Sequence, residues 1–242
     1  MSPSKTVIAF DLYGTLLSTE SISKELAKIY GDDKAQSLAT LWRRYQLEYT
    51  WRINSMGLYR TFSEITKGAL EHAVAETGLS LSAGDAEKLM KAYDSLHVFP
   101  EVPKALKAVK ETPDIDPYIF TNGTRDMVSA SVKLSPDLGP YADVFKGFIT
   151  VHEVQVFKPA IKVYDDLLTK VGKEGEAGEV WVVTANPFDA VGARAAGLQS
   201  AWIDRAGKGW VDRLGDVIGG IRPSVVVSGV DEAVGEIIKL AT

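Results

Sequence analysis

The part of the chain after Pro100 alternates between strand-like and helix-like segments, and this alternation restricts the possible folds more than any other feature. Short apolar, partly β-branched runs are expected to form strands at 117–120, 148–150, 180–183 and 200–203. Amphipathic segments between and beside them are expected to form helices at 102–110, 126–133, 161–171 and 189–196. Because neighbouring parallel strands need a long, usually helical crossover, this order predicts an α/β fold with a parallel sheet.

A single strand near the N-terminus is separated from this region by a long helical block. Thr6–Phe10 is an apolar run that leads into Asp11 and a glycine-containing loop. Residues 18–96 then show apolar side chains at helical spacing and almost no strand pattern, and amphipathic helices are expected at 66–77 and 83–96. We therefore expect a core domain made of residues 1–16 and 100–242, with a helical cap subdomain, residues 17–99, inserted after the first strand.

Composition and charge exclude several classes of function. The 242 residues are 45% hydrophobic, which is enough for a sizeable core. The net charge of −5 lacks the basic excess that nucleic-acid binding needs, and no apolar run is long enough to span a membrane. There is no cysteine, so thiolate catalysis and cysteine-bound zinc are excluded. We expect a cytoplasmic protein with neither nucleic-acid nor membrane partners.

Polar side chains follow successive strands of the predicted sheet. Asp11, the pair 121–122, Lys158 and the segment 186–189 each lie where a strand ends. Taken singly, the aspartates are also explained as turn or helix-cap residues, and the lysine as a solvated turn residue. Open α/β sheets, however, bind ligands at the carboxyl ends of their strands. The joint placement of these residues therefore predicts one shared site.

Six motifs occur in order between residues 7 and 205 and together identify a family. They are Asp-Leu-Tyr-Gly-Thr-Leu at 11–16, Leu-Trp-Arg at 41–43, Gln-Leu-Glu-Tyr-Thr-Trp at 46–51, Thr-Asn-Gly at 121–123, Val-Phe-Lys-Pro at 156–159 and Asn-Pro-Phe-Asp-Ala-Val-Gly-Ala-Arg at 186–194. This set resembles the haloacid dehalogenase superfamily and, within it, the type II L-2-haloacid dehalogenases. The resemblance implies a doubly wound, Rossmann-like core, a helical cap and a homodimer.

Two positions separate dehalogenases from the phosphatases of the superfamily. Phosphatases usually carry a second aspartate two residues after the nucleophile, and here that position is Tyr13. They also carry a magnesium-binding aspartate four residues before Asp189, where this chain has Ala185. An alanine offers Mg²⁺ no oxygen ligand. Both differences favour a reaction that needs neither a metal nor an acid for the leaving group, so we expect no cofactor and no metal.

The resemblance implies covalent catalysis by a carboxylate. Asp11 would attack C2 of a short L-2-haloalkanoate, expel halide with inversion and form an ester, which water would hydrolyse to the D-2-hydroxyalkanoate. At about 4 Å and an effective dielectric constant of about 20, two carboxylates repel each other by about 4 kcal/mol. Cations are therefore required. Lys158 would neutralise Asp11, Arg43 from the cap would face the halide or the substrate carboxylate, and Thr15 would orient Asp11.

The resemblance assigns the hydrolytic step to a second group of residues. Asn186 and Asp189 would position or activate the water, while Asp189 and Thr184 would also hold Lys158 in place. Tyr164 would support the same network. The expected substrate-binding residues are Leu12 and Tyr13 through their backbone amides, Thr121 at the carboxylate, Asn122 at the halide, and Phe62 and Phe188 on the apolar wall, with core packing an equal explanation for Phe62.

Two other functions stay open at this point. A magnesium-dependent phosphatase of the same superfamily would turn over phosphate esters, and a catalytically idle member would serve only as a binding or scaffold protein. The chain also departs from the usual family pattern, with Thr121 for serine, Ala185 for serine, Pro187 for alanine and Phe188 for tryptophan. Pro187 restricts Asn186 to extended geometry.

Overall fold

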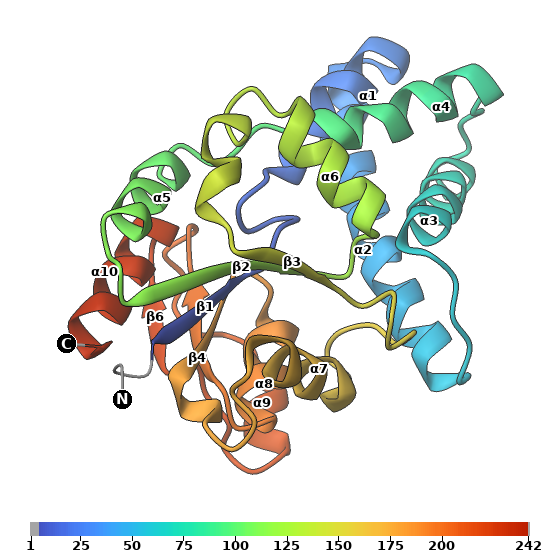
Figure 1. The fold of residues 1–242 in the computed structure, drawn as a ribbon. Helices are drawn as coiled ribbons and strands as arrows, with labels where there is room; N and C mark the ends of the chain where they lie inside the picture. The colour runs from blue at the N-terminus through green and yellow to red at the C-terminus, as the bar shows by residue number, and fades with distance from the viewer. Residues whose placement is uncertain (1–4, 242) are drawn as a thin grey trace.

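A parallel β-sheet of six strands forms the centre of the computed structural model, which describes residues 5–241 apart from the side chains of residues 20 and 94 (Figure 1). The strand order is β3-β2-β1-β4-β5-β6. The predicted α/β fold with a doubly wound parallel sheet is therefore confirmed; residues 1–4 and 242 of the expected core domain lie outside the described residues. The strands are β1 (Thr6–Phe10), β2 (Ile115–Thr121), β3 (Gly147–Thr150), β4 (Val180–Thr184), β5 (Gln199–Ile203) and β6 (Val225–Val227).

Helices cover both faces of the sheet, which explains why its central strands are apolar without alternation. All five residues of β4 and four of the five in β1 are buried. In Figure 1, α7 and α8 lie on one face of the sheet, and α5 and α10 lie on the other, where these two helices contact each other. The helices outside the predicted cap are α5 (Val102–Lys110), α6 (Arg125–Leu134), α7 (Ile161–Val171), α8 (Pro187–Ala195), α9 (Leu214–Val217) and α10 (Val230–Ala241).

The chain changes direction across the sheet between β1 and β4. From β1 it proceeds outward through β2 to β3, and it then returns to the other side of β1 to form β4, β5 and β6 in turn. Such a switch point leaves a crevice at the carboxyl ends of the two strands, because the connecting segments diverge to opposite faces. Asp11 follows β1 at this crevice, and Asn186 follows β4.

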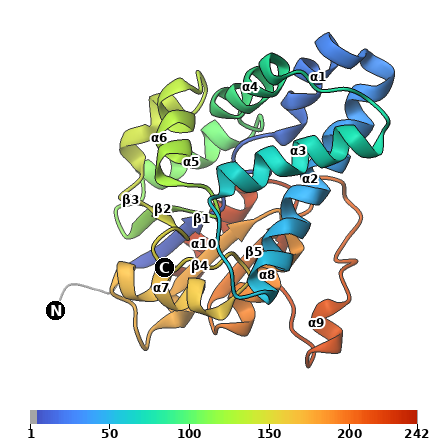
Figure 2. The ribbon, with the colours of Figure 1, turned by 90° about the vertical axis from the view of Figure 1, so that its right-hand side faces the viewer.

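The segment between β1 and α5 forms a block of mutually packed helices, which occupies the range expected for the cap. Figure 2 shows α2 extending from this block towards α8. Two connecting segments run side by side between block and sheet: Phe99 N donates to Leu16 O at 3.1 Å, and Ser18 N donates to His97 O at 2.8 Å. The helices are α1 (Ile22–Tyr30), α2 (Asp32–Ser55), α3 (Phe62–Glu76) and α4 (Ala83–Ala92).

Several element boundaries differ from the predicted ones for local reasons. α3 begins at Phe62 rather than at 66, because Thr61 and Glu64 form a capping box at its N-terminus. α8 begins two residues earlier than expected, at Pro187. Proline is tolerated at the first position of a helix because a backbone N–H has no intrahelical partner there, so its absence costs nothing. The strand β6 and the helix α10 were not predicted. Within the described residues, no helix is both long and apolar enough to cross a membrane.

Candidate active site

Asp11 lies at the centre of the crevice, and its hydrogen bonds gather on one of its two carboxylate oxygens. Oδ2 accepts from Thr15 Oγ1 at 2.7 Å and Asn186 Nδ2 at 2.8 Å, and Thr184 Oγ1 lies 3.5 Å away. Oδ1 lies 3.4 Å from Lys158 Nζ. The side chain is buried, so these donors offset the cost of removing a carboxylate from water. The unequal distribution leaves Oδ1 as the oxygen with more available lone pairs.

A tight turn after β1 brings Thr15 back to Asp11. Gly14 has a φ of +87°, a conformation that favours glycine. The Thr15 hydroxyl donates to Asp11 and also accepts from Ala185 N at 2.9 Å, so it joins the loops after β1 and β4. Arg205 donates from Nη2 to Thr15 O at 2.8 Å and from Nη1 to Gly14 O at 3.3 Å. The turn is therefore held from both sides.

Lys158 is a fully buried ammonium surrounded by acceptors. Its Nζ donates to Asp189 Oδ2 at 2.9 Å and to Phe120 O at 2.8 Å, and it lies 3.9 Å from the centre of the Phe120 ring. Its backbone N donates to Asn122 Oδ1 at 3.0 Å. A lysine this deeply buried needs paired charges. The turn-lysine explanation is excluded, since the side chain lies between the Asp11 and Asp189 carboxylates.

Asp189 accepts a hydrogen bond from Lys158, and Tyr164 in turn holds Asp189. Both side chains are buried, and Tyr164 Oη donates to Asp189 Oδ1 at 2.8 Å. Burial and the adjacent Asp189 carboxylate raise the pKa of Tyr164 well above 10, so its hydroxyl stays protonated and can donate. Burial also raises the pKa of Asp189, and the Lys158 ammonium opposes that shift.

Arg43 reaches the site from α2. Its Nη2 donates to Tyr13 O at 3.0 Å and lies 3.4 Å from Asn186 Oδ1, so Arg43 is linked through Asn186 to Asp11. Its Nη1 donates to Gln46 Oε1. Burial lowers the pKa of the Arg43 guanidinium, which nevertheless remains charged at neutral pH. Gln46 in turn donates from Nε2 to Thr66 Oγ1 at 2.6 Å, which ties Arg43 to α3.

Aromatic side chains line the apolar side of the crevice. The Tyr13 ring stacks on Phe62 with centroids 5.9 Å apart, and Phe62 lies 6.1 Å from Phe157. Phe188 meets Trp51 of α2 edge to face at 5.3 Å. Phe62 is buried among these rings, which agrees both with core packing and with a position on the apolar wall of the crevice.

The remaining predicted residues also lie around the strand ends, with one difference in contacts. The Thr121 hydroxyl accepts from Gly123 N at 3.1 Å, and Leu12 is fully buried beside Asp11. Thr184, expected to hold Lys158, instead approaches Asp11 and accepts from Asn186 N at 3.1 Å. The Asn186 backbone is extended, as Pro187 requires.

Sequence reasoning missed several polar groups that shape the site. They are Gln46 and Thr66 beside Arg43, the Phe120 carbonyl at Lys158, Arg205 at the turn after β1, and Asn54, which binds the Phe157 backbone. Gln46 belongs to one of the recognised motifs, so its position three residues after Arg43 on a helix was a usable signal. The others come from segments whose spacing carries no pattern.

The buried charges of the site balance. Asp11 and Asp189 supply two negative charges, and Lys158 and Arg43 supply two positive ones. Among the side chains that the structure describes, no group of three or more histidine, cysteine, aspartate or glutamate residues is arranged to hold a metal ion. The arrangement places the Asp11 carboxylate, whose Oδ1 has fewer donors than Oδ2, in the same cluster as two cationic side chains.

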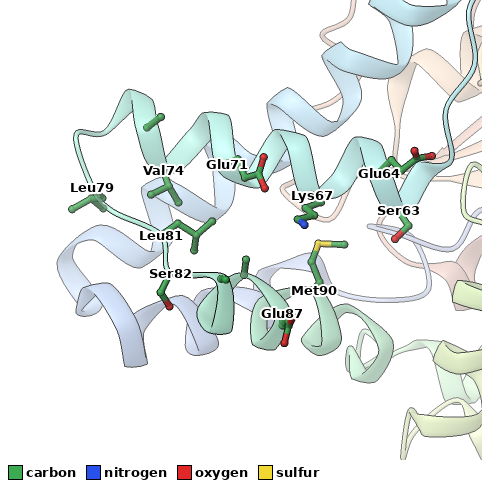
Figure 3. A pocket seen from close by; sticks show the side chains of 13 residues that line it. Ser63, Glu64, Lys67, Glu71, Val74, Leu79, Leu81, Ser82, Glu87 and Met90 are labelled. Carbon is green, nitrogen blue, oxygen red and sulfur yellow. The ribbon is translucent and has the colours of Figure 1, made fainter.

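A separate surface cleft of about 680 Å³ lies between α3 and α4, away from this crevice (Figure 3). Val74, Leu79 and Leu81 form its apolar part, and Glu71 and Lys67 lie along it. No residue of the predicted site lines it. The candidate active site is therefore the crevice at the strand ends.

Comparison with known proteins agrees with this geometry. The family model for haloacid dehalogenase-like hydrolases matches residues 5–197. The chain belongs to this family. It is 34% identical over 200 residues to the (S)-2-haloacid dehalogenase of Pseudomonas sp. (strain YL), covering 83% of each chain. It is also 34% identical over 208 residues to haloacetate dehalogenase H-2 of Moraxella sp. (strain B), covering 86% of this chain and 89% of the relative.

A solved structure of the same family closely matches the fold. The L-2-haloacid dehalogenase of Xanthobacter autotrophicus, determined with chloropropionic acid covalently bound, superposes with a TM-score of 0.84 at 25% identity. The match covers 98% of this chain and 100% of the Xanthobacter chain. The haloacid dehalogenase-like fold is therefore shared over the cap range as well as the sheet.

Proposed function

We propose that this protein is a (S)-2-haloacid dehalogenase that converts short L-2-haloalkanoates to D-2-hydroxyalkanoates and halide without a metal. The observation that carries the proposal is the Asp11 carboxylate. Its Oδ2 is held by Thr15 and Asn186, while Oδ1 faces Lys158. Similarity to relatives that are named (S)-2-haloacid dehalogenases supports the same conclusion.

The first step is a displacement at carbon. Asp11 Oδ1 forms a bond to C2 of the substrate from the side opposite the halogen, and the carbon–halogen bond breaks with its electron pair leaving on the halide. Because Oδ2 is engaged by donors, the carboxylate is fixed for attack through Oδ1. The product of this step is an ester between Asp11 and the inverted C2.

Cations make the approach of two carboxylates possible. Lys158 offsets the charge of Asp11, and Arg43 is the cation that can receive the substrate carboxylate or the departing halide. Halide is a weak base and leaves without a proton. Tyr13 therefore suffices at a position where phosphatases of the superfamily carry an acid, and Ala185 provides no oxygen for a magnesium ion.

The second step is hydrolysis of the ester. Water attacks Cγ of Asp11 and one of its protons passes to the Asp189 carboxylate; the bond from Cγ to Oδ1, the oxygen now joined to C2, then breaks to release the 2-hydroxyacid. The released hydroxyl oxygen takes that proton back from Asp189, and the Asp11 carboxyl group, which keeps the oxygen of water, gives its remaining proton to solvent. Overall, haloacid and water give hydroxyacid, halide and one proton. Asn186 and Thr184 lie within hydrogen-bond distance of Asp11 Oδ2, where negative charge develops.

Chloride release from each enantiomer of 2-chloropropionate tests the proposal. The assay contains EDTA and compares wild type with Asp11→Ala and with Asp33→Asn, an exposed control at the start of α2. We expect release from the L enantiomer only, unaffected by EDTA, retained in Asp33→Asn and lost in Asp11→Ala. A single turnover in ¹⁸O-labelled water should place the label in Asp11.

Other outcomes would overturn the proposal in distinct ways. Phosphate-ester turnover that requires Mg²⁺, without chloride release, would establish the phosphatase alternative. A folded protein without either activity would establish the idle binding or scaffold alternative.

We also propose that the protein is a homodimer, as the family resemblance implies. Sedimentation equilibrium tests this oligomeric state.

A further inference from the structure

The side chain of Asn54 pairs with both backbone groups of one residue next to the active-site lysine. Its Nδ2 donates to Phe157 O at 2.8 Å, and its Oδ1 accepts from Phe157 N at 2.9 Å. Phe157 is fully buried and immediately precedes Lys158. Asparagine suits this position because its amide provides one donor and one acceptor side by side.

Asn54 and Arg43 attach the same face of α2 to the sheet domain at two separate points. They are eleven residues apart, which at 3.6 residues per turn returns to within about 20° of the same direction and spans about 16 Å. Arg43 binds the Tyr13 carbonyl after β1, and Asn54 binds the Phe157 backbone before α7. One attachment is two residues after Asp11, and the other immediately precedes Lys158.

Substrate has to enter a site that this arrangement covers. Asp11 is 6% exposed, Lys158 1% and Phe62 1%. Because Arg43 and Asn54 join α2 to the backbone beside Asp11 and Lys158, movement of α2 away from the strand ends would open a path from solvent to Asp11 Oδ1. Both attachments must then break, and both form again when the site closes.

We propose that Asn54 is a positioning residue that latches α2 to the Phe157 backbone and thereby favours the closed arrangement of the site around Asp11. The consequence for catalysis rests on the proposed function; the latch itself does not. Losing two hydrogen bonds of ordinary net strength lowers the ratio of closed to open protein by about tenfold. Since the Asp11, Lys158 and Asp189 contacts are intact whenever the site closes, the KM for L-2-chloropropionate rises about tenfold, while kcat changes by less than about threefold.

Three variants separate the latch from general packing. Asn54→Ala removes both hydrogen bonds. Asn54→Asp keeps the shape and the acceptor but places a carboxylate oxygen against Phe157 O, so we expect an increase in KM at least as large as that in Asn54→Ala. Ser55→Ala is the matched control, since Ser55 is exposed at the same helix end and its hydroxyl donates to Arg52 O at 2.8 Å.

Hydrogen exchange of the Phe157 amide provides a readout that needs no catalytic activity. We expect faster exchange in Asn54→Ala than in wild type and Ser55→Ala, with unchanged circular dichroism. If exchange is unchanged in Asn54→Ala, the latch is wrong whatever the activity. If exchange rises but chloride release is absent in wild type too, the latch stands and the proposed function fails.

The kinetic arm decides whether the latch positions the site. A rise in KM in both variants supports the proposal, and an Asn54→Asp variant with wild-type KM overturns it, because shape alone would then be sufficient. A fall in kcat with unchanged KM also overturns it. If Asn54→Ala does not fold, the isosteric Asn54→Asp variant carries the test.

Discussion

Replacement of Lys158 by methionine should destabilise the protein strongly. In the wild type, Lys158 Nζ lies 3.4 Å from Asp11 Oδ1 and 2.9 Å from Asp189 Oδ2. Methionine fills a similar volume but leaves both carboxylates buried without their shared cation. Removing one partner of a buried ion pair costs about 3–5 kcal/mol. Because one ammonium serves two carboxylates here, we expect a loss in the free energy of unfolding near the upper end, about 4–5 kcal/mol.

A double-mutant cycle identifies the origin of that loss. Asp189→Asn removes one of the two carboxylates, so Lys158→Met combined with Asp189→Asn should be more stable than Lys158→Met alone by about 2 kcal/mol. Urea unfolding at neutral pH, followed by circular dichroism, measures all three variants. Lys104→Met is the control: Lys104 Nζ also lies 2.7 Å from a carboxylate, that of Asp231, but on the exposed surface.

Two results would refute this reasoning. If Lys158→Met costs less than about 1 kcal/mol, the lysine does not neutralise the buried carboxylates as the distances indicate. If the cycle shows no coupling, the loss comes from packing against Phe120 rather than from charge. Lys104→Met should leave the free energy of unfolding nearly unchanged in either case.

Three further predictions follow from local contacts. Gly192→Ala should destabilise the protein by at least about 2 kcal/mol, since a Cβ at this position would lie 2.4 Å from Tyr164 Oη. Gly235→Ala is the control, because a Cβ there would meet no atom within 4 Å, and it should stabilise the protein by up to about 1 kcal/mol. The same urea assay measures both variants. Burial raises the pKa of Tyr93 to about 12, so its stabilising contribution is present below pH 10 and lost as pH rises towards 12. Between pH 10 and pH 12, the free energy of unfolding should therefore fall by about 2 kcal/mol less in Tyr93→Phe than in wild type. An equal fall in both proteins would contradict the raised pKa of Tyr93. Thr15→Val removes a donor to the proposed nucleophile and should lower kcat/KM for L-2-chloropropionate by about 10–100-fold; an unchanged value would show that this hydroxyl does not orient the carboxylate.

The sheet and most of its helices were predictable because their signals are local. Thr6–Phe10, Val102–Lys110 and Ile161–Val171 form elements with the predicted bounds, since each is a continuous apolar or amphipathic segment between turn residues. The strand β6 was missed because its Val-Val-Val run is only three residues long, too short to show a strand pattern. The boundary of α3 was missed because it depends on a side-chain cap rather than on periodicity.

The sequence by itself determined which residues stand at the strand ends, because parallel strands joined by helices must place those ends together. It thereby brought Asp11, Asn122, Lys158 and Asn186 to one edge of the sheet. The direction of each side chain was decided only by the tertiary structure. Packing of separate segments selected Oδ2 of Asp11 as the oxygen that receives the hydrogen bonds.

Contacts from the helical block were even less accessible to sequence reasoning. Arg43 is separated from Asn186 by 143 positions, and Asn54 from Phe157 by 103, yet their side chains meet. Such contacts depend on how α2 lies over the strand ends, which no local pattern encodes. Hydrophobic periodicity specifies which face of a helix is buried, but only the packed structure decides which backbone group that face will meet.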